Sequence, residues 1–249
     1  MLDVFFLSYN EPYADENYEL LLEKAPHAKR VNGITGFTAA HQECARRSLT
    51  NNFYVVDSDA VILQDFEFFF TPSKYNTWWG IPESECLCLW NSINPINDLT
   101  YGHGGVKLLP KQSLLTKNPN TVDFTTGFGL SVKVFDQVSN VTKFNYDEFS
   151  TWRSAFRECV KLATNLTNEE LRHKLNYNDE IIDKIVEESN QRLKIWTTKG
   201  KKRPFGKYAI SGAIQGRDYG LEHAENSQEL KVINDLEWMK NEFIKFTEQ

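Results

Sequence analysis

Two aspartates separated by one residue, Asp57 and Asp59, are the strongest candidates for chemistry in this sequence of 249 residues. They directly follow residues 53–56, an uninterrupted apolar run typical of a buried strand. Where a strand gives way to a loop, both carboxylates can lean toward one side and share a hard divalent cation, Mg²⁺ or Mn²⁺. Because two carboxylates do not complete a coordination shell, a nucleotide diphosphate would supply further oxygens. The alternative is an aspartate-rich turn that caps a helix.

The surrounding elements favour a ligand site. Strand and helix patterns alternate over residues 3–7, 16–24, 28–31, 38–49 and 53–56, with Thr38 as the expected helix cap. This alternation predicts a mainly parallel sheet, which binds ligands just outside the carboxyl ends of its strands. The polar loop Ser8-Tyr9-Asn10-Glu11 ends the first strand and is expected at the same edge as Asp57, Ser58 and Asp59.

The pattern of apolar residues changes near the middle of the chain. Residues 78–109 predict two or three strands with a glycine-lined loop between them, and beyond residue 151 helical spacing dominates. Helices are expected over residues 152–162, 168–175, 179–193 and 227–246, with residues 199–220 as the non-helical exception. We therefore expect an α/β core over residues 1–150 and a helical extension of the same domain over residues 151–249.

Two glycine-rich segments carry further candidates. Gly104 and Gly105, after Gly102 and His103, allow the backbone to approach a ligand closely, although a bulge or tight hairpin explains them equally well. His103 taken alone is a structural residue. Residues 212–220 are expected to form a glycine-spaced loop before the last helix.

An acidic segment opens the helical half of the chain. Asp147 and Glu148 precede a helix that carries Arg157 and Glu158, and Arg153 lies one turn before Arg157. The two arginines can face a phosphate together, and ordinary surface salt bridges are the alternative.

The first sixty residues resemble the nucleotide-binding half of GT-A-fold glycosyltransferases: a strand ending in Ser8-Tyr9-Asn10, then Asn32-Gly33-Ile-Thr-Gly36 before a helix, then Asp57-Ser58-Asp59. The resemblance implies a GT-A-like, Rossmann-type mixed or mainly parallel sheet flanked by helices, with residues 1–150 binding the nucleotide-sugar, which is expected to be a UDP-sugar. Ser8, Tyr9, Asn10, Glu11 and Gly36 would contact the nucleotide, and Asp57, Ser58 and Asp59 the ribose and the metal-diphosphate. Gly104 and Gly105 would line the donor sugar. The resemblance further implies a catalytic carboxylate at Asp147 or Glu148, with Arg157 and Glu158 beside it, and His223 as an extra metal ligand, although the Asp-Glu pair departs from the family's usual pattern.

Composition excludes several classes of protein. The net charge is −6 with an isoelectric point near 5.5, so no overall field draws the chain to nucleic acid or to an anionic membrane. Four cysteines without zinc-type spacing predict free, mostly buried thiols. The N-terminus has no signal-peptide pattern and no stretch reaches the length of a membrane span, so a cytoplasmic protein is expected.

One segment goes against the acidic balance. Five cations gather in nine residues: Lys199, Lys201, Lys202, Arg203 and Lys207. They form either a solvated loop or a nucleic-acid-binding segment.

The overall texture resembles the glycosyltransferases with which tailed phages modify hydroxymethylated DNA bases, glucosyl and arabinosyl transfer included. The resemblance implies double-stranded DNA containing 5-hydroxymethylcytosine as the acceptor and the host cytoplasm as the location, with Trp78, Trp79, Trp90 or Trp152 stacking on a flipped base. A glycan, lipid or protein acceptor, a sugar nucleotidyltransferase and a non-catalytic binding module remain open as alternatives.

Overall fold

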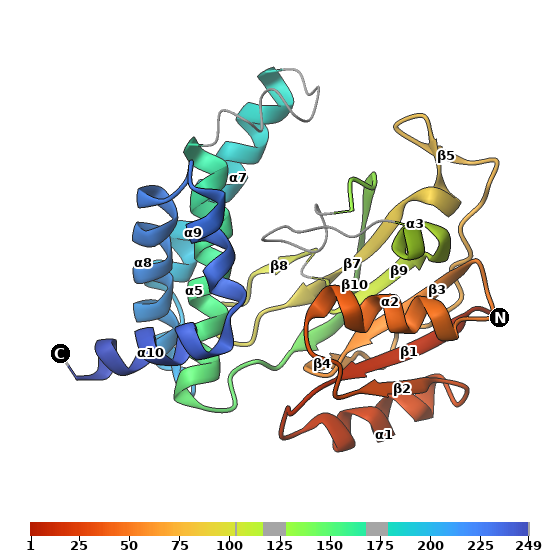
Figure 1. Ribbon diagram of the computed structural model, residues 1–249, viewed down its shortest axis with the longest axis horizontal. Coiled ribbons are helices and arrows are strands. Elements are labelled where there is room, and N and C mark those ends of the chain that lie inside the picture. The colour runs from red at the N-terminus through yellow and green to blue at the C-terminus, as the bar shows by residue number, and fades with distance from the viewer. Residues whose placement is uncertain (103, 117–127, 168–178, 249) are drawn as a thin grey trace. The chain divides into compact units, whose positions relative to one another are not determined.

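The computed structural model describes residues 1–102, 104–116, 128–167 and 179–248, and the chain divides into two compact units. Unit 1 comprises Met1–Asn94 and Thr100–Lys143, and unit 2 comprises Pro95–Leu99 and Phe144–Gln249. Unit 1 contains the sheet and the helices that flank it, whereas unit 2 is helical (Figure 1). The predicted α/β class, Rossmann-like with a helical C-terminal half, is confirmed.

Unit 1 begins with the alternation that the sequence predicted. Its first elements are β1 (Asp3–Ser8), α1 (Ala14–Lys24), β2 (Lys29–Asn32), α2 (Phe37–Arg47) and β3 (Asn52–Asp57). The later elements are β4 (Ala60–Ile62), β5 (Thr77–Trp78), β6 (Ile81–Pro82), β7 (Leu87–Ile93), β8 (Thr100–Tyr101), β9 (Val106–Pro110), α3 (Lys111–Thr116) and β10 (Val132–Thr142). A short 3₁₀ helix, Glu83–Glu85, precedes β7.

The main sheet is mixed, with most of its strands in one direction. Its order is β2-β1-β3-β9-β7-β10-β4, and β8 pairs with β7. Strand β1 is parallel to β2 and β3, and β7 is parallel to β10, whereas β9 is antiparallel to both β3 and β7. Strands β2, β1, β3, β7 and β10 therefore share one direction, which confirms the mixed, mainly parallel sheet.

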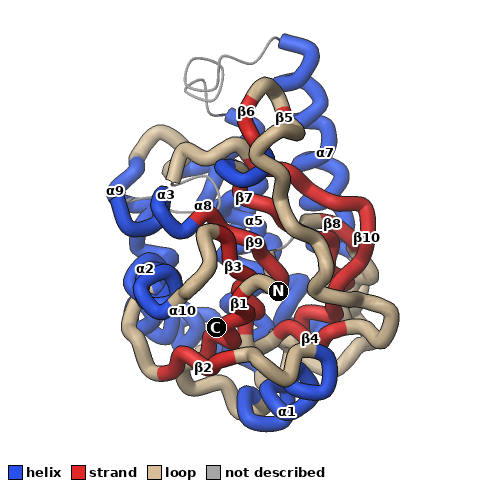
Figure 2. Tube along the Cα trace, turned by 90° about the vertical axis from the view of Figure 1, so that its right-hand side faces the viewer, coloured by secondary structure: helices blue, strands red, loops and turns tan. Residues whose placement is uncertain are grey.

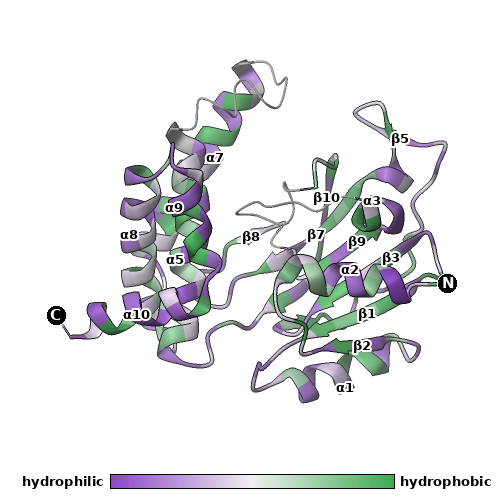
Figure 3. Cartoon of the chain, viewed as in Figure 1, coloured by the Kyte–Doolittle hydropathy of each residue, from purple (hydrophilic) through white to green (hydrophobic). Residues whose placement is uncertain are grey.

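Alternate residues of the strands pack on opposite faces of the sheet, as the two-residue period of a strand requires. Phe6 and Val56 lie in the core that α1 covers, and Phe5 and Val55 lie in the core that α2 covers. Helices α1 and α2 accordingly flank β1 from different sides (Figure 2). Hydrophobic residues run along the central strands (Figure 3), and they contribute to both cores.

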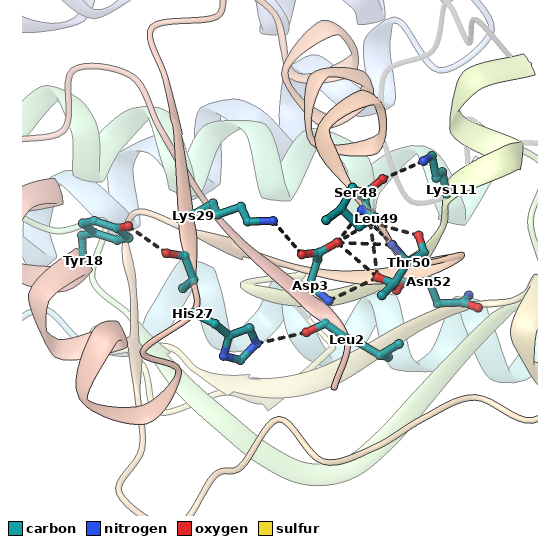
Figure 4. A network of polar contacts seen from close by, with 11 residues as sticks. Leu2, Asp3, Tyr18, His27, Lys29, Ser48, Leu49, Thr50, Asn52 and Lys111 are labelled. Carbon is teal, nitrogen blue, oxygen red and sulfur yellow. Dashed lines mark hydrogen bonds and ion pairs between the residues drawn. The ribbon is translucent and has the colours of Figure 1, made fainter.

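The start of β1 is fixed by a carboxylate, Asp3, which joins three elements (Figure 4). It accepts hydrogen bonds from Lys29 of β2 (2.8 Å), from the Ser48 hydroxyl (3.1 Å) and from the Leu49 backbone amide (2.5 Å). Burial raises the pKa of Asp3, but these hydrogen bonds outweigh burial, and the pKa lies below its ordinary value. The network anchors β1 between β2 and the segment that leads into β3.

Some local predictions for unit 1 were wrong. Helix α2 begins at Phe37 with Gly36 (φ 88°) as its N-cap, so Thr38 lies inside the helix, which ends at Arg47. Residues 78–109 contain more strands than expected, because β5, β6 and β8 are only two residues long. The sequence reasoning also missed β10, whose register shifts on either side of Val138 interrupt the alternation of apolar residues.

Unit 2 is built from helices α5 (Glu148–Thr167), α7 (Asp179–Thr198), α8 (Gly206–Glu222), α9 (Ser227–Lys231) and α10 (Leu236–Thr247), with a 3₁₀ helix at Val232–Asn234. Helices α5, α7 and α8 pack around a core that includes Trp196, Cys159 and Ala213. The expected single helix over residues 227–246 is divided, because the Asp235 side chain caps α10 by accepting from the amides of Glu237 and Trp238. The helix expected over residues 168–175 lies outside the described residues.

The prediction of a non-helical segment over residues 199–220, and of a glycine-spaced loop at its end, was wrong, because α8 occupies most of this range. Its glycines lie against the backbone of α5. A Cβ atom on Gly212 would come within 2.4 Å of the Trp152 carbonyl oxygen, and one on Gly216 within 2.2 Å of that of Phe156. The glycines thus serve close helix packing rather than a turn.

Substituting Gly216 by alanine is expected to destabilise unit 2. Alanine favours a helix interior by up to about 1 kcal/mol over glycine, but the methyl group forces α8 away from α5, and we expect a net loss of about 2 kcal/mol. Urea unfolding followed by circular dichroism measures the change. Asp218→Ala, on the exposed side of the same helix, should change the stability by less than about 0.5 kcal/mol. Equal effects of both variants would contradict the packing role.

The structure bears on two further predictions, which concern the cysteines and membrane-spanning helices. All four cysteines, Cys44, Cys86, Cys88 and Cys159, are free and buried, as predicted. Among the described helices, none combines the length and the apolar character that crossing a membrane requires.

Candidate functional site

The Asp57–Asp59 loop lies where the connections of the sheet change direction. From β1 the chain passes to β2 on one side, and it returns to form β3 on the other side of β1. Such a switch point leaves a crevice outside the carboxyl ends of the two central strands, and open α/β sheets bind ligands there. Ser8 ends β1 and Asp57 ends β3, so the first two predicted segments meet at this edge.

The backbone of this loop is held in place from several directions. The Asp57 amide donates to the residue before β9 and the Ser58 amide donates to β1, whereas the Ser58 and Asp59 carbonyls accept from α1 and from the residue after β10. The four bonds are Asp57 N to Gly105 O (2.9 Å), Ser58 N to Leu7 O (3.0 Å), Asn17 Nδ2 to Ser58 O (2.7 Å) and Lys143 N to Asp59 O (2.6 Å). The loop is therefore preorganised, which a catalytic or metal-binding segment requires.

A lysine that sequence reasoning did not select completes the site. Lys107 of β9 is 4% exposed, and its ammonium lies 2.7 Å from each carboxylate oxygen of Asp57 and 2.5 Å from the Gly104 carbonyl oxygen. The Asp57 side chain is 36% exposed, so it lies between the buried ammonium and solvent. His41 is buried nearby; burial and the charge of Lys107 lower its pKa, so its ring stays neutral.

Asp59 is in a different electrostatic position from Asp57. Burial, followed by the charges of Asp57 and Glu11, raises the pKa of Asp59 to about 7, and Lys107 compensates only in part. Two further carboxylates and one ammonium thus act on Asp59. A site with this excess of negative charge attracts a further cation.

The donor set fits a divalent metal that arrives with phosphate ligands. The residues that the structure describes contain no group of three histidine, cysteine or acidic side chains that could hold an ion. Two carboxylates nevertheless suffice where Mg²⁺ or Mn²⁺ takes its remaining oxygens from a nucleotide and water. Asp57 and Asp59 could thus hold such an ion only together with oxygens from another molecule.

The loop after β1 supplies polar groups beside the aspartates. Ser8 Oγ is hydrogen-bonded to the Asn32 amide (2.8 Å) and accepts from Arg30 Nε (2.8 Å), which links the ends of β1 and β2. The Glu11 carboxylate accepts from the Tyr9 amide at 2.7 Å. The Tyr9 side chain is 44% exposed, and Asn10 is exposed beside it. An exposed ring and an exposed amide are suited to stacking on a base and to hydrogen bonding.

The glycines of the predicted site have conformational roles. Gly36 (φ 88°) and Gly104 (φ 82°) adopt the left-handed region, where other residues are strained. A Cβ atom on Gly105 would lie 2.6 Å from Asn140 Nδ2, so this position requires glycine. Asn140 belongs to a buried network with Ser92 and Ser139, and it thereby fixes the turn whose carbonyl receives the Asp57 amide. His103 lies outside the described residues.

The predicted acceptor-side residues belong to unit 2. Asp147 Oδ1 accepts from the Ser150 amide (2.6 Å) and thus caps α5, whose first residue is Glu148. Arg157 donates to the Asn234 side chain at 2.7 Å, and Glu158 pairs with Lys161 at 3.1 Å. His223 follows the last residue of α8, with its ring 4.3 Å from that of Tyr219. The catalytic role of the first four residues and the metal role of His223 stay predictions.

The predicted nucleic-acid-binding cations also belong to unit 2, in the connection from α7 to α8 and at the start of α8. Lys199, Lys201, Lys202, Arg203 and Lys207 are all exposed. Arg203 pairs with Asp98 at 3.2 Å, and Lys207 lies over the Tyr208 ring. Of the tryptophans considered for base stacking, Trp90 and Trp152 are 2% and 1% exposed, so their assignment was wrong. Trp79 is 75% exposed.

The signal for Lys107 was present in the sequence. A single lysine interrupts the apolar run from Val106 to Leu109, and a lysine at an inward-facing strand position needs a buried partner. Which partner it has depends on the pairing of β9 with β3, which places Lys107 opposite Val55, two residues before Asp57. Sequence reasoning alone did not provide that pairing.

Comparison with known proteins adds little to this geometry. No protein-family profile and no curated protein matches the sequence. Among solved structures, HddC from Yersinia pseudotuberculosis matches with 12% identity and a TM-score of 0.34, covering 57% of this chain and 91% of that chain. A glycosyltransferase involved in the glycosylation of the major capsid of PBCV-1 matches with 14% identity and a TM-score of 0.30, covering 53% of this chain and 81% of that one. These TM-scores are too low to support an inference about activity.

Proposed function

We propose that this chain is a metal-dependent GT-A-type glycosyltransferase that takes a sugar from a nucleotide-sugar donor, which we take to be a UDP-sugar. The observation that carries the proposal is the rigid Asp57–Asp59 loop at the switch point between β1 and β3, with more carboxylate than ammonium charge around it. Nucleotide diphosphates with Mg²⁺ or Mn²⁺ combine the charge and the oxygen ligands that such a site lacks.

In this proposal the residues of unit 1 bind and orient the donor. Tyr9 stacks on the base, Ser8, Asn10 and Glu11 contact the base or the ribose, and Asp57 and Asp59 hold the ribose and the metal-diphosphate. Gly36 has open space where a Cβ would stand, so its backbone can approach the donor, and Gly104 and Gly105 line the donor sugar. A bound metal would supply Lewis-acid stabilisation of charge on the leaving diphosphate.

For the acceptor we propose the hydroxymethyl group of 5-hydroxymethylcytosine in phage DNA. The support is the exposed cationic connection between α7 and α8, since DNA binding draws on lysines and arginines that contact phosphates. Asp147 or Glu148 would take the proton of the attacking hydroxyl. The alternatives are a glycan, lipid or protein acceptor and sugar nucleotidyl transfer; the loop after β1, Ser8 to Tyr13, lacks the glycine-rich, cationic sequence that the last reaction needs.

Thermal unfolding with Mn²⁺ and a panel of nucleotides tests the donor. A ligand at a hundred times its Kd adds about 2.7 kcal/mol to the stability of the native state, which for a chain of this size corresponds to a shift of roughly 5–10 °C in Tm. We expect this shift with UDP or a UDP-sugar together with Mn²⁺, and a much smaller one with either alone, because the metal and the diphosphate complete each other's ligands.

The acceptor is tested with the same protein. Transfer of labelled sugar to DNA that contains 5-hydroxymethylcytosine, and not to unmodified DNA, would support the DNA proposal. Transfer only to glycans would favour the first alternative. A stabilisation by nucleoside triphosphates and sugar phosphates, without one by nucleotide-sugars, would contradict the glycosyltransferase proposal and favour nucleotidyl transfer.

A further inference from the structure

The neighbours of Lys107 in the sheet are apolar, so its ammonium has few polar groups with which it can pair. In the sheet Lys107 is paired with Val55 on one side and Leu89 on the other. Both neighbours belong to the core between the sheet and α2. The ammonium is therefore held at Asp57 and Gly104, because moving away from them would leave its charge buried without a partner.

The position of the ammonium determines how Asp57 can bind a cation. The equal distances of 2.7 Å place Nζ between the two carboxylate oxygens, on the face that a metal uses for bidentate binding. A divalent ion on that face would have to displace Lys107 or approach a like charge closely. By contrast, no side chain among the described residues donates a hydrogen bond to the Asp59 carboxylate.

We propose that Lys107 is a positioning residue of the donor site: its ammonium keeps the bidentate face of Asp57 closed to the metal, so that Asp59 binds the metal and Asp57 accepts hydrogen bonds from the donor. This inference rests on the proposed function. Lys107 thereby determines which of the two aspartates is open to the metal.

The test is the affinity of the full chain for Mn²⁺ alone, measured by the electron paramagnetic resonance signal of free Mn²⁺ in the parent and in Lys107→Met. Methionine preserves the volume of the side chain in its apolar surroundings. Without the ammonium, Asp57 can chelate the ion together with Asp59, and a repulsive charge is lost; we expect Mn²⁺ to bind about tenfold more tightly. The KM for the nucleotide-sugar should rise at the same time, because Asp57 loses its fixed orientation.

A merely structural role of Lys107 predicts the reverse sign, since a loosened site binds Mn²⁺ more weakly. Lys74→Met removes an equal charge from an exposed position of unit 1 and should leave the affinity within about twofold. Adding Asp57→Asn to Lys107→Met should return Mn²⁺ binding to the parental level or below.

The outcomes separate this inference from the function on which it rests. Tighter Mn²⁺ binding in Lys107→Met that Asp57→Asn reverses supports it. Unchanged or weaker binding in a folded Lys107→Met, next to clear binding by the parent, overturns this inference and leaves the proposed function standing. An absence of Mn²⁺ binding in every protein, with no nucleotide effect on Tm, overturns both.

Discussion

Replacing Asp57 by alanine is expected to lower the free energy of unfolding by about 3 kcal/mol, the lower end of the range for removing one partner of a buried ion pair. The loss comes from the residue that remains. Lys107 is 4% exposed, so its ammonium is poorly hydrated where it lies, and the Gly104 carbonyl oxygen becomes its main remaining protein partner. We place the loss at the lower end because the Asp57 side chain is 36% exposed and water can enter the space that it leaves. Urea unfolding at constant pH measures the change.

Replacing the other partner of this ion pair is the matched control. Lys107→Met removes the buried charge and leaves Asp57 at a surface where water can hydrate it, so its stability should lie within about 1 kcal/mol of the parent. The double variant, Asp57→Ala with Lys107→Met, should recover at least half of the loss caused by Asp57→Ala. If Asp57→Ala unfolds like the parent, or if the double variant is the least stable of the three, the stranded charge is not the cause.

Replacing Asp59 by asparagine is expected to reduce turnover by about two to three orders of magnitude, as does the loss of one group that stabilises charge in a transition state. The same substitution should make the protein without metal more stable at neutral and alkaline pH. The pKa of Asp59 is raised from 3.8 to about 7, chiefly by burial. The folded state therefore holds this proton more tightly than the unfolded chain. The contribution of this group to stability is fully present below the unfolded pKa and is lost as the pH rises through the folded one.

This reasoning gives Asp59→Asn a characteristic pH profile. Its stability advantage over the parent should be small near the unfolded pKa of 3.8, grow as the pH rises toward about 7, and level off above it. Thermal unfolding across this range without metal measures the advantage, and the Mn²⁺-dependent shift with a nucleotide diphosphate should be absent in the variant. Turnover at the parental rate would exclude a metal role for Asp59. A stability difference that does not change with pH would show that the carboxyl group titrates normally.

The two aspartates of one short motif are thus expected to act on stability in opposite directions. Asp57 neutralises a buried lysine, whereas Asp59 adds to an existing excess of negative charge. Functional sites often retain groups that destabilise the fold, because the same charge is needed for the ligand.

The sequence by itself determined the alternation of elements around the candidate site. Residues 4–7 and 53–56 are apolar at every position, and this pattern is typical of strands that are covered on both faces. That pattern predicted the mainly parallel sheet and placed Ser8 and Asp57 at the carboxyl ends of its strands. Local chemistry sufficed here because hydrophobic periodicity and turn residues act over a few positions.

Only the tertiary structure decided the features that depend on distant partners. The glycines of α8 looked like turn residues, since no local pattern shows that the α5 backbone lies against them. The bulges of β10 hid a strand that is recognisable by its pairing with β7. Lys107 acquired its role through the register of β9 with β3, which brings it to Asp57, fifty positions away in the chain. Pairing between distant segments follows from the packing of the whole sheet, and a window along one sequence does not contain that information.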